Sequence, residues 1–198
     1  MSDPRVVDPA VLVQAYRQGI FPMAVETGEI GWFSPDPRGI LPIESFHVPS
    51  RLARVLRQGR FDVHVDRAFT EVMRACALRP DGDGTWINDD IVEGYTALHR
   101  LGLAHSVETW QDGRLAGGLY GVHLGGAFFG ESMFHRVTDA SKVALAALVE
   151  RLDRRGFLLL DVQWVTPHLE RFGAIEVSRA QYLARLRRAL ERDCTFLD

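Results

Sequence analysis

The sequence predicts an α+β fold in which a mixed, mostly antiparallel sheet is covered by helices. Three strand-like segments follow one another closely, at residues 105–110, 114–122 and 127–134. Asp112-Gly113 between the first two is typical of a hairpin turn. A helical segment at residues 139–154 comes next, and residues 157–163 then predict a strand too apolar for a sheet edge. Antiparallel strands followed by a helix and a buried strand indicate a mixed sheet.

The N-terminal part of the chain predicts a small lobe with little regular structure. Asp8-Pro9 is typical of a helix start, because aspartate caps helices and proline fits the first turn, and Gly19 ends this helix. The next segment is rich in proline, glycine and aromatic residues, which predict turns and short strands. We therefore expect a small N-terminal lobe at residues 1–60 and a larger domain at residues 61–198.

Shorter elements complete the prediction on both sides of the three strands. Before them we expect a helix capped by Ser50 and ended by Gly59, a strand at residues 61–65, a helix capped by Asp66 that runs through residue 77, an acidic loop at residues 80–84 and a helix at residues 90–101. Thr138 or Asp139 caps the 139–154 helix. After the buried strand we expect a short helix from Thr166-Pro167 to Gly173, a strand at residues 175–177 and a helix capped by Ser178.

The composition is that of an ordinary globular protein of 198 residues, 46% apolar and 25% charged. A formal net charge of −3 argues against a protein that coats nucleic acid indiscriminately, although it allows a local basic patch. Residues 1–8 predict no signal peptide, and no apolar run reaches the roughly 18 residues of a membrane span. Cys76 and Cys194 lie far apart and match neither a disulfide framework nor a metal site, so we expect a cytoplasmic protein without membrane or metal.

Asp161 and Gln163 are the first candidates for chemistry. They lie two residues apart at the C-terminal end of an otherwise apolar strand, and such residues point to the same face of a sheet. Buried polar groups at this place need hydrogen-bond partners or a function. The alternative is a carboxylate that binds the N-terminus of a nearby helix.

Glu131 is the second candidate, because it lies at the end of a predicted strand among Phe128, Phe129 and Phe134. A carboxylate in so apolar a stretch indicates a buried site rather than a solvated surface. The alternative is a glutamate at the strand edge that faces water.

A row of arginines recurs at intervals of three residues, at Arg51, Arg54, Arg57 and Arg60. At least the first three lie along one side of the predicted helix, and no carboxylate occurs between Glu44 and Asp62 to neutralise them. Arginine guanidinium groups suit phosphate oxygens, so the row predicts a contact with nucleic acid. A solvated basic face is the alternative.

Trp86 follows the glycine-rich loop, where an indole ring can stack on the base at a single-stranded RNA end. The alternative is an ordinary anchor for the loop. Other motifs are absent from the sequence, since the histidines are scattered and no P-loop or nucleophile elbow occurs. Gly117-Gly118 and Gly125-Gly126 lie between strands rather than before a helix, which does not favour a pyrophosphate site.

Taken together, these segments resemble the leucyl/phenylalanyl-tRNA–protein transferase family. The matching segments follow the family's order over nearly the whole chain: AYRQGIFP (15–22), WFSPDPR (32–38), GTWI (84–87), AHSVE (104–108), GGLYGV (117–122), GESMF (130–134), DASK (139–142), DVQ (161–163) and FGA (172–174). The resemblance implies a small N-terminal lobe on a larger catalytic domain with an acetyltransferase-like (GNAT-like) fold.

The resemblance also implies roles for individual residues. Gln163 matches the family's catalytic glutamine and Asp161 its supporting aspartate, while Glu131 matches the glutamate that holds the substrate amine. Trp86 matches the tryptophan near the terminal adenosine of the tRNA, and the arginine row falls where the family binds the acceptor stem. The further substrate-binding residues implied are Leu119, Phe128, Met133, Leu145, Leu148 and Leu160. Phe33 and Thr166 depart from the family pattern, which has tryptophan and asparagine there.

The implied reaction moves leucine or phenylalanine, with methionine as a further candidate, from aminoacyl-tRNA to the N-terminal amine of proteins that begin with arginine or lysine. The product is then recognised for degradation. The donor ester is already activated, so the reaction needs no cofactor, ATP or metal. We expect Gln163 to accept a hydrogen bond from the attacking amine and Asp161 to take the proton, because glutamine is not a base.

Two other functions are compatible with parts of this pattern. An acyl-CoA-dependent N-acetyltransferase would need a glycine-rich turn before the long helix, where this sequence has Thr138-Asp139-Ala140. A non-catalytic module that binds RNA or protein N-termini would give Asp161 and Gln163 no role beyond binding. Transfer of an amino acid from charged tRNA distinguishes these functions.

Overall fold

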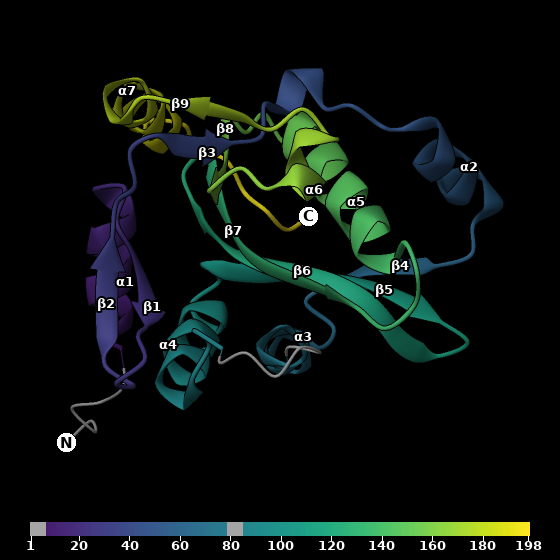
Figure 1. Cartoon of the computed structure of the whole chain (residues 1–198), viewed down its shortest axis with the longest axis horizontal. Coiled ribbons are helices and arrows are strands. Elements are labelled where there is room, and N and C mark those ends of the chain that lie inside the picture. The colour runs from purple at the N-terminus through teal and green to yellow at the C-terminus, as the bar shows by residue number, and fades with distance from the viewer. Residues whose placement is uncertain (1–6, 79–84) are drawn as a thin grey trace.

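A computed structural model describes residues 7–78 and 85–198, and its main element is a seven-stranded sheet of order β4-β5-β6-β7-β8-β3-β9 (Figure 1). Neighbouring strands are antiparallel except β7 and β8, which are parallel. The strands are β4 (Asp62–Val65), β5 (Ala104–Gln111), β6 (Arg114–Leu124), β7 (Ala127–His135), β8 (Leu159–Gln163), β3 (Arg38–Ile40) and β9 (Ile175–Val177). The prediction of a mixed, mostly antiparallel sheet is therefore confirmed.

The hairpin between β5 and β6 turns where the sequence predicts it. Asp112 and Gly113 both have positive φ, of 51° and 73°, which matches a two-residue turn whose twist fits antiparallel strands. The buried strand β8 lies between β7 and β3, inside the sheet, as its apolar sequence predicts. It begins at Leu159 rather than at residue 157.

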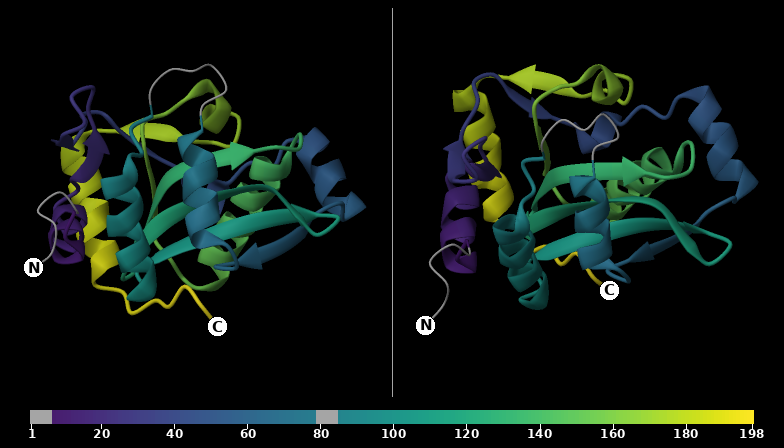
Figure 2. Two further views of the ribbon diagram at one scale, coloured as in Figure 1. Left: turned by 90° about the horizontal axis from the view of Figure 1, so that it is seen from below. Right: turned by 60° about the horizontal axis from the view of Figure 1, so that its bottom comes forward.

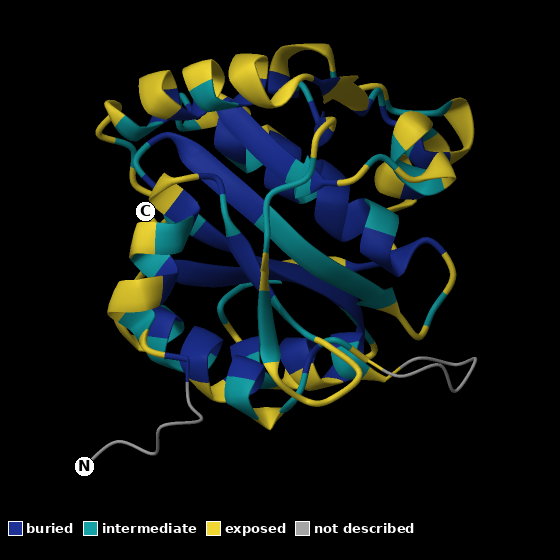
Figure 3. Ribbon diagram, turned by 60° about the vertical axis from the view of Figure 1, so that its left-hand side comes forward, coloured by how far each residue is buried: buried dark blue, intermediate teal, exposed yellow. Residues whose placement is uncertain are grey.

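Helices cover both faces of the sheet (Figure 2). One face carries α3 (Phe69–Ala77) and α4 (Asp89–Arg100), and the same hydrophobic cluster includes residues of α1 (Pro9–Arg17) and α7 (Arg179–Leu190). The other face carries the long helix α5 (Ala140–Arg154), whose cluster includes residues of α2 (Ser50–Gln58) and of the 3₁₀ turn η1 (Ile43–Ser45). The sheet is consequently buried between the two layers, with exposed residues on the outer sides of the helices (Figure 3).

The N-terminal residues contribute both to a separate hairpin and to the main sheet. β1 (Phe21–Ala24) and β2 (Ile30–Phe33) form a two-stranded sheet of their own. β3 instead pairs with β8 and β9, so a strand from residues 1–60 lies inside the larger sheet. The division of the chain at residue 60 stays a prediction, and the only separate sheet in residues 7–78 and 85–198 is this hairpin.

Several helix starts differ from the sequence-based expectation. Ser50 is the first residue of α2, and Pro49 occupies the capping position. Asp66 does not cap α3, because its carboxylate accepts a hydrogen bond from the Ser106 amide at 2.8 Å and α3 begins at Phe69. Asp139 precedes α5 in a left-handed conformation, and its carboxylate binds Lys142 rather than the helix amides. The acidic loop at residues 80–84 lies outside the described residues.

Within residues 7–78 and 85–198, no helix is both long and apolar enough to cross a membrane. The same part of the chain holds no group of three or more His, Cys, Asp or Glu side chains arranged to bind a metal ion.

Candidate active site

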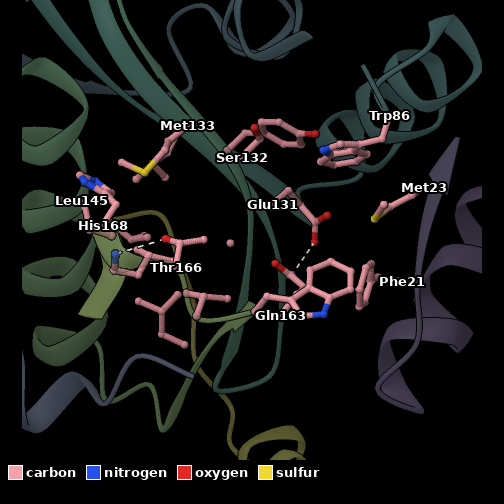
Figure 4. Close-up of a pocket in the computed structure, with 18 residues that line it drawn as sticks. Phe21, Met23, Trp86, Glu131, Ser132, Met133, Leu145, Gln163, Thr166 and His168 are labelled. Carbon is pink, nitrogen blue, oxygen red and sulfur yellow. Dashed lines mark hydrogen bonds between the residues drawn. The ribbon is translucent and has the colours of Figure 1, made fainter. Parts of the chain in front are cut away.

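The candidate site lies where β7 and β8 separate. The parallel register between them ends at the pair Phe129 and Asp161, and the residues beyond this pair face a cavity of about 340 Å³ (Figure 4). α5, α6 (Pro167–Glu170) and the β1 strand complete its walls. Eight predicted site residues line the cavity: Trp86, Leu119, Glu131, Met133, Leu145, Leu148, Leu160 and Gln163. The fold thus brings together residues from distant parts of the sequence.

Glu131 enters the cavity because of a β-bulge in β7. Gly130 pairs with Gly121 and Ser132 pairs with Tyr120, which leaves Glu131 without a partner on β6. An extra residue of this kind interrupts the alternation of side chains and can redirect one of them. Glu131 therefore lies in the middle of β7, not at the strand end that the sequence suggested.

The Glu131 carboxylate lies among tyrosine hydroxyls. Tyr16 donates a hydrogen bond to Oε1 at 2.7 Å, the Tyr95 hydroxyl lies 3.4 Å from Oε2, and the two tyrosine hydroxyls also bond to each other. Burial raises the pKa of Glu131 to about 8, and the hydrogen bond from Tyr16 opposes part of that rise. Glu131 is thus a carboxyl group that can exchange a proton near neutral pH.

Gln163 faces Glu131 across the cavity, with its Nε2 atom 3.4 Å from Glu131 Oε1. Its backbone is unusual, since φ is 58° and the Trp164 amide donates to the Val162 carbonyl at 2.7 Å. This bond spans three residues and makes a γ-turn centred on Gln163, a strained conformation for a residue with a side chain. The turn directs Gln163 into the cavity at the end of β8.

Asp161 is not in the cavity, which corrects the expectation that it projects beside the Gln163 side chain. Leu160 and Val162 line the cavity, so Asp161 between them faces away, as the alternation of a strand requires, and the turn at Gln163 then breaks this alternation. Its carboxylate is fully buried and binds the Arg38 guanidinium through Nε at 2.9 Å and Nη2 at 2.6 Å. Asp161 contacts Gln163 through the backbone amide of that residue, at 2.9 Å.

The floor of the cavity is apolar. Leu119 on β6, Leu145 and Leu148 on α5, and Leu160 on β8 supply only carbon atoms to it. Phe128 does not join them, in contrast to the expectation from the sequence. It is fully buried, and its ring stacks on Phe196 at a centroid distance of 5.1 Å, because its strand position faces the core beneath the cavity.

The sequence assigned no catalytic or binding role to the other residues that line the cavity. They are Phe21, Met23, Tyr120, Gly130, Ser132, Val162, Trp164, Thr166, His168 and Leu169. Phe21, like Tyr16 and Arg38, belongs to a segment that matches the family. Those matches were the feature of the sequence that could have indicated a role in the site. Burial, the largest cause, lowers the pKa of His168 together with the nearby cations Lys142 and Arg171, which favours its neutral form.

The arginine row lies on the exposed side of α2 and just beyond its end, away from the cavity walls. Arg51 is 72% exposed and its Nε lies 3.8 Å from Asp139 Oδ2. No carboxylate occurs within the segment itself, but the fold places the Asp139 carboxylate beside Arg51. Arg60 lies over the Phe61 ring at 5.5 Å.

Comparisons with solved structures find weak likenesses. A ribosomal-protein-alanine N-acetyltransferase from Brucella melitensis is 16% identical, with a TM-score of 0.40 over 56% of this chain and 86% of that one. The structure of L-PGS from Bacillus licheniformis is 11% identical, with a TM-score of 0.45 over 79% of this chain and 65% of that one.

Comparisons of sequence are much closer. The leucyl/phenylalanyl-tRNA–protein transferase of Rubrobacter xylanophilus is 54% identical over 95% of this chain and 97% of its own length. The enzyme of the same name from Paramagnetospirillum magneticum is 56% identical over 94% of this chain and 90% of its own length. The sequence models of the leucyl/phenylalanyl-tRNA protein transferase and of its N-terminal domain match residues 40–187 and 6–36. The chain belongs to the leucyl/phenylalanyl-tRNA protein transferase family.

Proposed function

We propose that this protein transfers leucine or phenylalanine from aminoacyl-tRNA to the N-terminal amine of an acceptor protein. The observation that carries the proposal is the arrangement of Gln163 and Glu131, which face each other above an apolar cavity floor. The floor suits an apolar amino-acid side chain, and the two polar groups suit an amine and an ester carbonyl above it. The names of the relatives, which describe such transferases, support the same reaction.

In the proposed reaction the acceptor nitrogen attacks the ester carbonyl carbon. The new C–N bond forms, the bond from the carbonyl carbon to the ribose oxygen breaks, and the proton lost by the amine replaces it on that oxygen. Gln163 orients the amine through its side-chain amide, while the apolar floor holds the aminoacyl side chain. No redox step or activation by ATP is involved, because the ester is already activated.

Glu131 is the group that we assign to proton transfer, in place of Asp161. Its pKa of about 8 is close to the unperturbed range of roughly 7.7–8.0 for an α-amino group, so proton exchange between the two is nearly balanced. A base whose pKa matches the working pH is the most effective in this role. Asp161 lies behind the turn and has no access to the cavity.

The surroundings of α5 favour this donor over acyl-CoA. A coenzyme A pyrophosphate would need a helix N-terminus with free amides or glycines. Asp139 occupies the N-terminal position of α5 instead, and the hydrogen bond from Lys142 is the largest cause of its lowered pKa. A carboxylate at this position repels a pyrophosphate.

We further propose that acceptors begin with arginine or lysine, that the product is a degradation signal, and that the reaction occurs in the cytoplasm. Glu131 at the cavity suits a positively charged acceptor end when its carboxyl group is ionised. Methionine is a further donor amino acid, because it resembles leucine in polarity and length.

The test is transfer of labelled leucine from leucyl-tRNA to a peptide that begins with arginine. The matched control is the same peptide with an acetylated N-terminus, which offers no nucleophile. Acetyl-CoA replaces leucyl-tRNA in a second reaction. Label in the free peptide only, and none from acetyl-CoA, is the expected result, whereas acetylation of the peptide or no transfer at all would contradict the proposal.

A further inference from the structure

A buried ion pair lies directly behind the turn that carries Gln163. Arg38 is 1% exposed and Asp161 is 0% exposed, and the guanidinium binds both carboxylate oxygens. Arg38 comes from β3, the strand that pairs with β8. The two residues are 123 positions apart in the sequence, so only the folded sheet brings them together.

The hydrogen-bonding capacity of the Asp161 carboxylate is filled. Oδ1 accepts from Arg38 Nε and from the Gln163 amide, while Oδ2 accepts from Arg38 Nη2 and from the Tyr182 hydroxyl at 2.6 Å. An ionised carboxylate offers about four acceptor sites, and these four donors occupy them. A fifth partner, such as a transferred proton, would have to displace one of these donors.

Arg38 is itself fixed on every side. Its Nη1 atom donates to the Gly19 carbonyl at 3.0 Å, and its guanidinium lies over the rings of Phe21 and Tyr182 at 4.8 Å and 4.5 Å. Phe21 also lines the cavity. The planar, delocalised guanidinium suits this combination of stacking and a two-pronged hydrogen bond, whereas a lysine ammonium would not reproduce it.

The turn at Gln163 is the feature that this cluster supports. The strained φ of 58° persists only if the surroundings hold it, and the bond from the Gln163 amide to Asp161 is one such restraint. β3 supplies another, because a Cβ atom on Gly39 would lie 2.7 Å from the Trp164 carbonyl carbon. The first restraint comes from Asp161 on β8, the partner of Arg38, and the second comes from Gly39 on β3.

We propose that Arg38 is a positioning residue, which fixes Asp161 so that the Asp161 carboxylate holds the Gln163 turn and directs the Gln163 side chain into the cavity. Asp161 acts in this way as a hydrogen-bond acceptor for the backbone and not as the acceptor of the substrate proton. The inference rests on the proposed function, and it adds Arg38 and Tyr182 to the residues that determine the rate.

A double-mutant cycle separates positioning from proton transfer. Arg38→Gln leaves a buried carboxylate without its cation, and Asp161→Asn leaves a buried guanidinium without its anion, so each should lower kcat by roughly 100-fold with KM changed less than about threefold. The double variant Arg38→Gln/Asp161→Asn has a neutral pair, and the side-chain oxygen of the asparagine could still accept the Gln163 amide. Its kcat should recover at least about tenfold over either single variant.

Hydrogen exchange of the Gln163 amide gives a readout that does not depend on transfer. This amide should exchange slowly in the wild type and in the double variant, and at least about tenfold faster in Arg38→Gln. The matched control is Arg179→Gln, because Arg179 binds the nearby Ser34 carbonyl and does not contact Asp161. It should leave both exchange and kcat unchanged.

Tyr182→Phe provides a variant that keeps the ring packing of the cluster. It removes one donor to Asp161 and frees one acceptor site on the carboxylate. If Asp161 only positions Gln163, kcat should fall about threefold to tenfold and the pH profile should keep its shape. A changed shape of the profile would show that the freed carboxylate takes part in proton transfer.

The outcomes are distinguishable. A double variant as inactive as Asp161→Asn, with the Gln163 amide still protected, would overturn the inference. It would indicate that Asp161 accepts the proton of the substrate amine. An unprotected amide in the wild type would overturn it as well. A wild type that transfers no amino acid, but shows the expected exchange pattern, would contradict the proposed function and leave the positioning role supported.

Discussion

Two carboxylates on neighbouring strands of this protein have opposite surroundings. Asp161 on β8 accepts four hydrogen bonds, two of them from the Arg38 guanidinium, and it does not line the cavity. Among the described residues, the hydrogen-bond partners of Glu131 on β7 are the neutral Tyr16 and Tyr95 hydroxyls and the Gln163 amide, and Glu131 faces the cavity. Both carboxyl groups are buried, so the difference between them lies in their partners, which include a cation for Asp161 and only neutral groups for Glu131.

The difference follows from two local irregularities of the backbone. A β-bulge turns Glu131 into the cavity, and a γ-turn after Asp161 brings Gln163 there while Asp161 stays behind it. A regular β8 strand would instead have placed Gln163 on the same face as Asp161, away from the cavity. The chemistry of the site therefore depends on where two strands depart from ideal geometry.

The largest expected effect is that of Glu131→Gln on transfer. Glutamine keeps the size of Glu131 and can accept the Tyr16 hydrogen bond, but it cannot take a proton, so kcat/KM should fall by roughly 10²–10⁴. The wild-type reaction needs a deprotonated Glu131 and a deprotonated acceptor amine. Below about pH 7.5, the logarithm of kcat/KM for the wild type should rise with pH with a slope of about 2. For Glu131→Gln the slope should be about 1.

The matched variant Asp161→Asn distinguishes the two carboxylates in the same measurement. Its rate should be low, but its slope against pH should stay near that of the wild type, because Glu131 still titrates. A wild-type slope in Glu131→Gln together with a reduced slope in Asp161→Asn would reverse the roles of the two residues.

The second effect concerns stability. Glu131 has a folded-state pKa of about 8, above the usual glutamate pKa of 4.5, so the folded state binds one more proton than the unfolded state between these values. Its contribution to stability is complete below about pH 4.5 and is lost as the pH rises through about 8. Glu131→Gln should therefore gain stability relative to the wild type over this range, by on the order of a few kcal/mol.

Thermal or urea unfolding of the two proteins at pH 5 and pH 8.5 measures this difference. Glu71→Gln is the matched control, because Glu71 is 51% exposed and forms an exposed ion pair with Arg136. It should keep the pH dependence of the wild type. Parallel curves for Glu131→Gln and the wild type would mean that the Glu131 carboxyl is not held in its protonated form.

The third effect is on the choice of amino acid. Leu145→Ala enlarges the cavity floor, so leucine should lose about 1–3 kcal/mol of transition-state binding while the larger phenylalanine loses less. Phe128→Ala should instead lower the free energy of unfolding by about 3–5 kcal/mol with an unchanged preference, since Phe128 packs in the core. Competition between leucyl- and phenylalanyl-tRNA measures both variants, and a shift for Phe128→Ala alone would contradict the observed floor.

Much of the fold could be predicted because it depends on local patterns. The alternation of β5 to β7, the Asp112-Gly113 turn and the apolar run of β8 each determine an element within a few residues. Cavity residues such as Leu119 and Leu145 followed from the family resemblance, since spacing alone does not place two elements around one cavity.

The rest of the site depends on contacts between distant residues and on irregular backbone. No pattern in β7 indicates that Glu131 is the extra residue of a bulge, because the bulge is defined by its pairing with β6. The prediction that Asp161 and Gln163 share a face was wrong, because it assumed that β8 stays regular up to its last residue. Arg38 stands 123 residues before its partner, so its place in a family motif was visible in the sequence but its interaction with Asp161 was not.

The smallest effect should come from charges that are exposed rather than buried. Replacing Arg51, Arg54 and Arg57 by alanine should weaken binding about equally for every accepted tRNA, because phosphate contacts carry no sequence information. Each lost phosphate contact should reduce the slope of log affinity against log salt by roughly 0.7–0.9. Arg51 should contribute least, because Asp139 lies 3.8 Å from it and competes with phosphate.

A second arginine row tests whether position matters or only charge. Arg185, Arg187 and Arg188 are exposed on α7, which lies at the opposite end of the molecule from α2 (Figure 1). Replacing these three by alanine removes the same net charge, so a purely long-range attraction would weaken by the same amount. If α2 holds the acceptor stem, only the α2 variant should lose salt slope, and kcat at saturating aminoacyl-tRNA should stay unchanged in both. An equal loss in the two variants would mean that the α2 arginines act through net charge and form no specific tRNA contact.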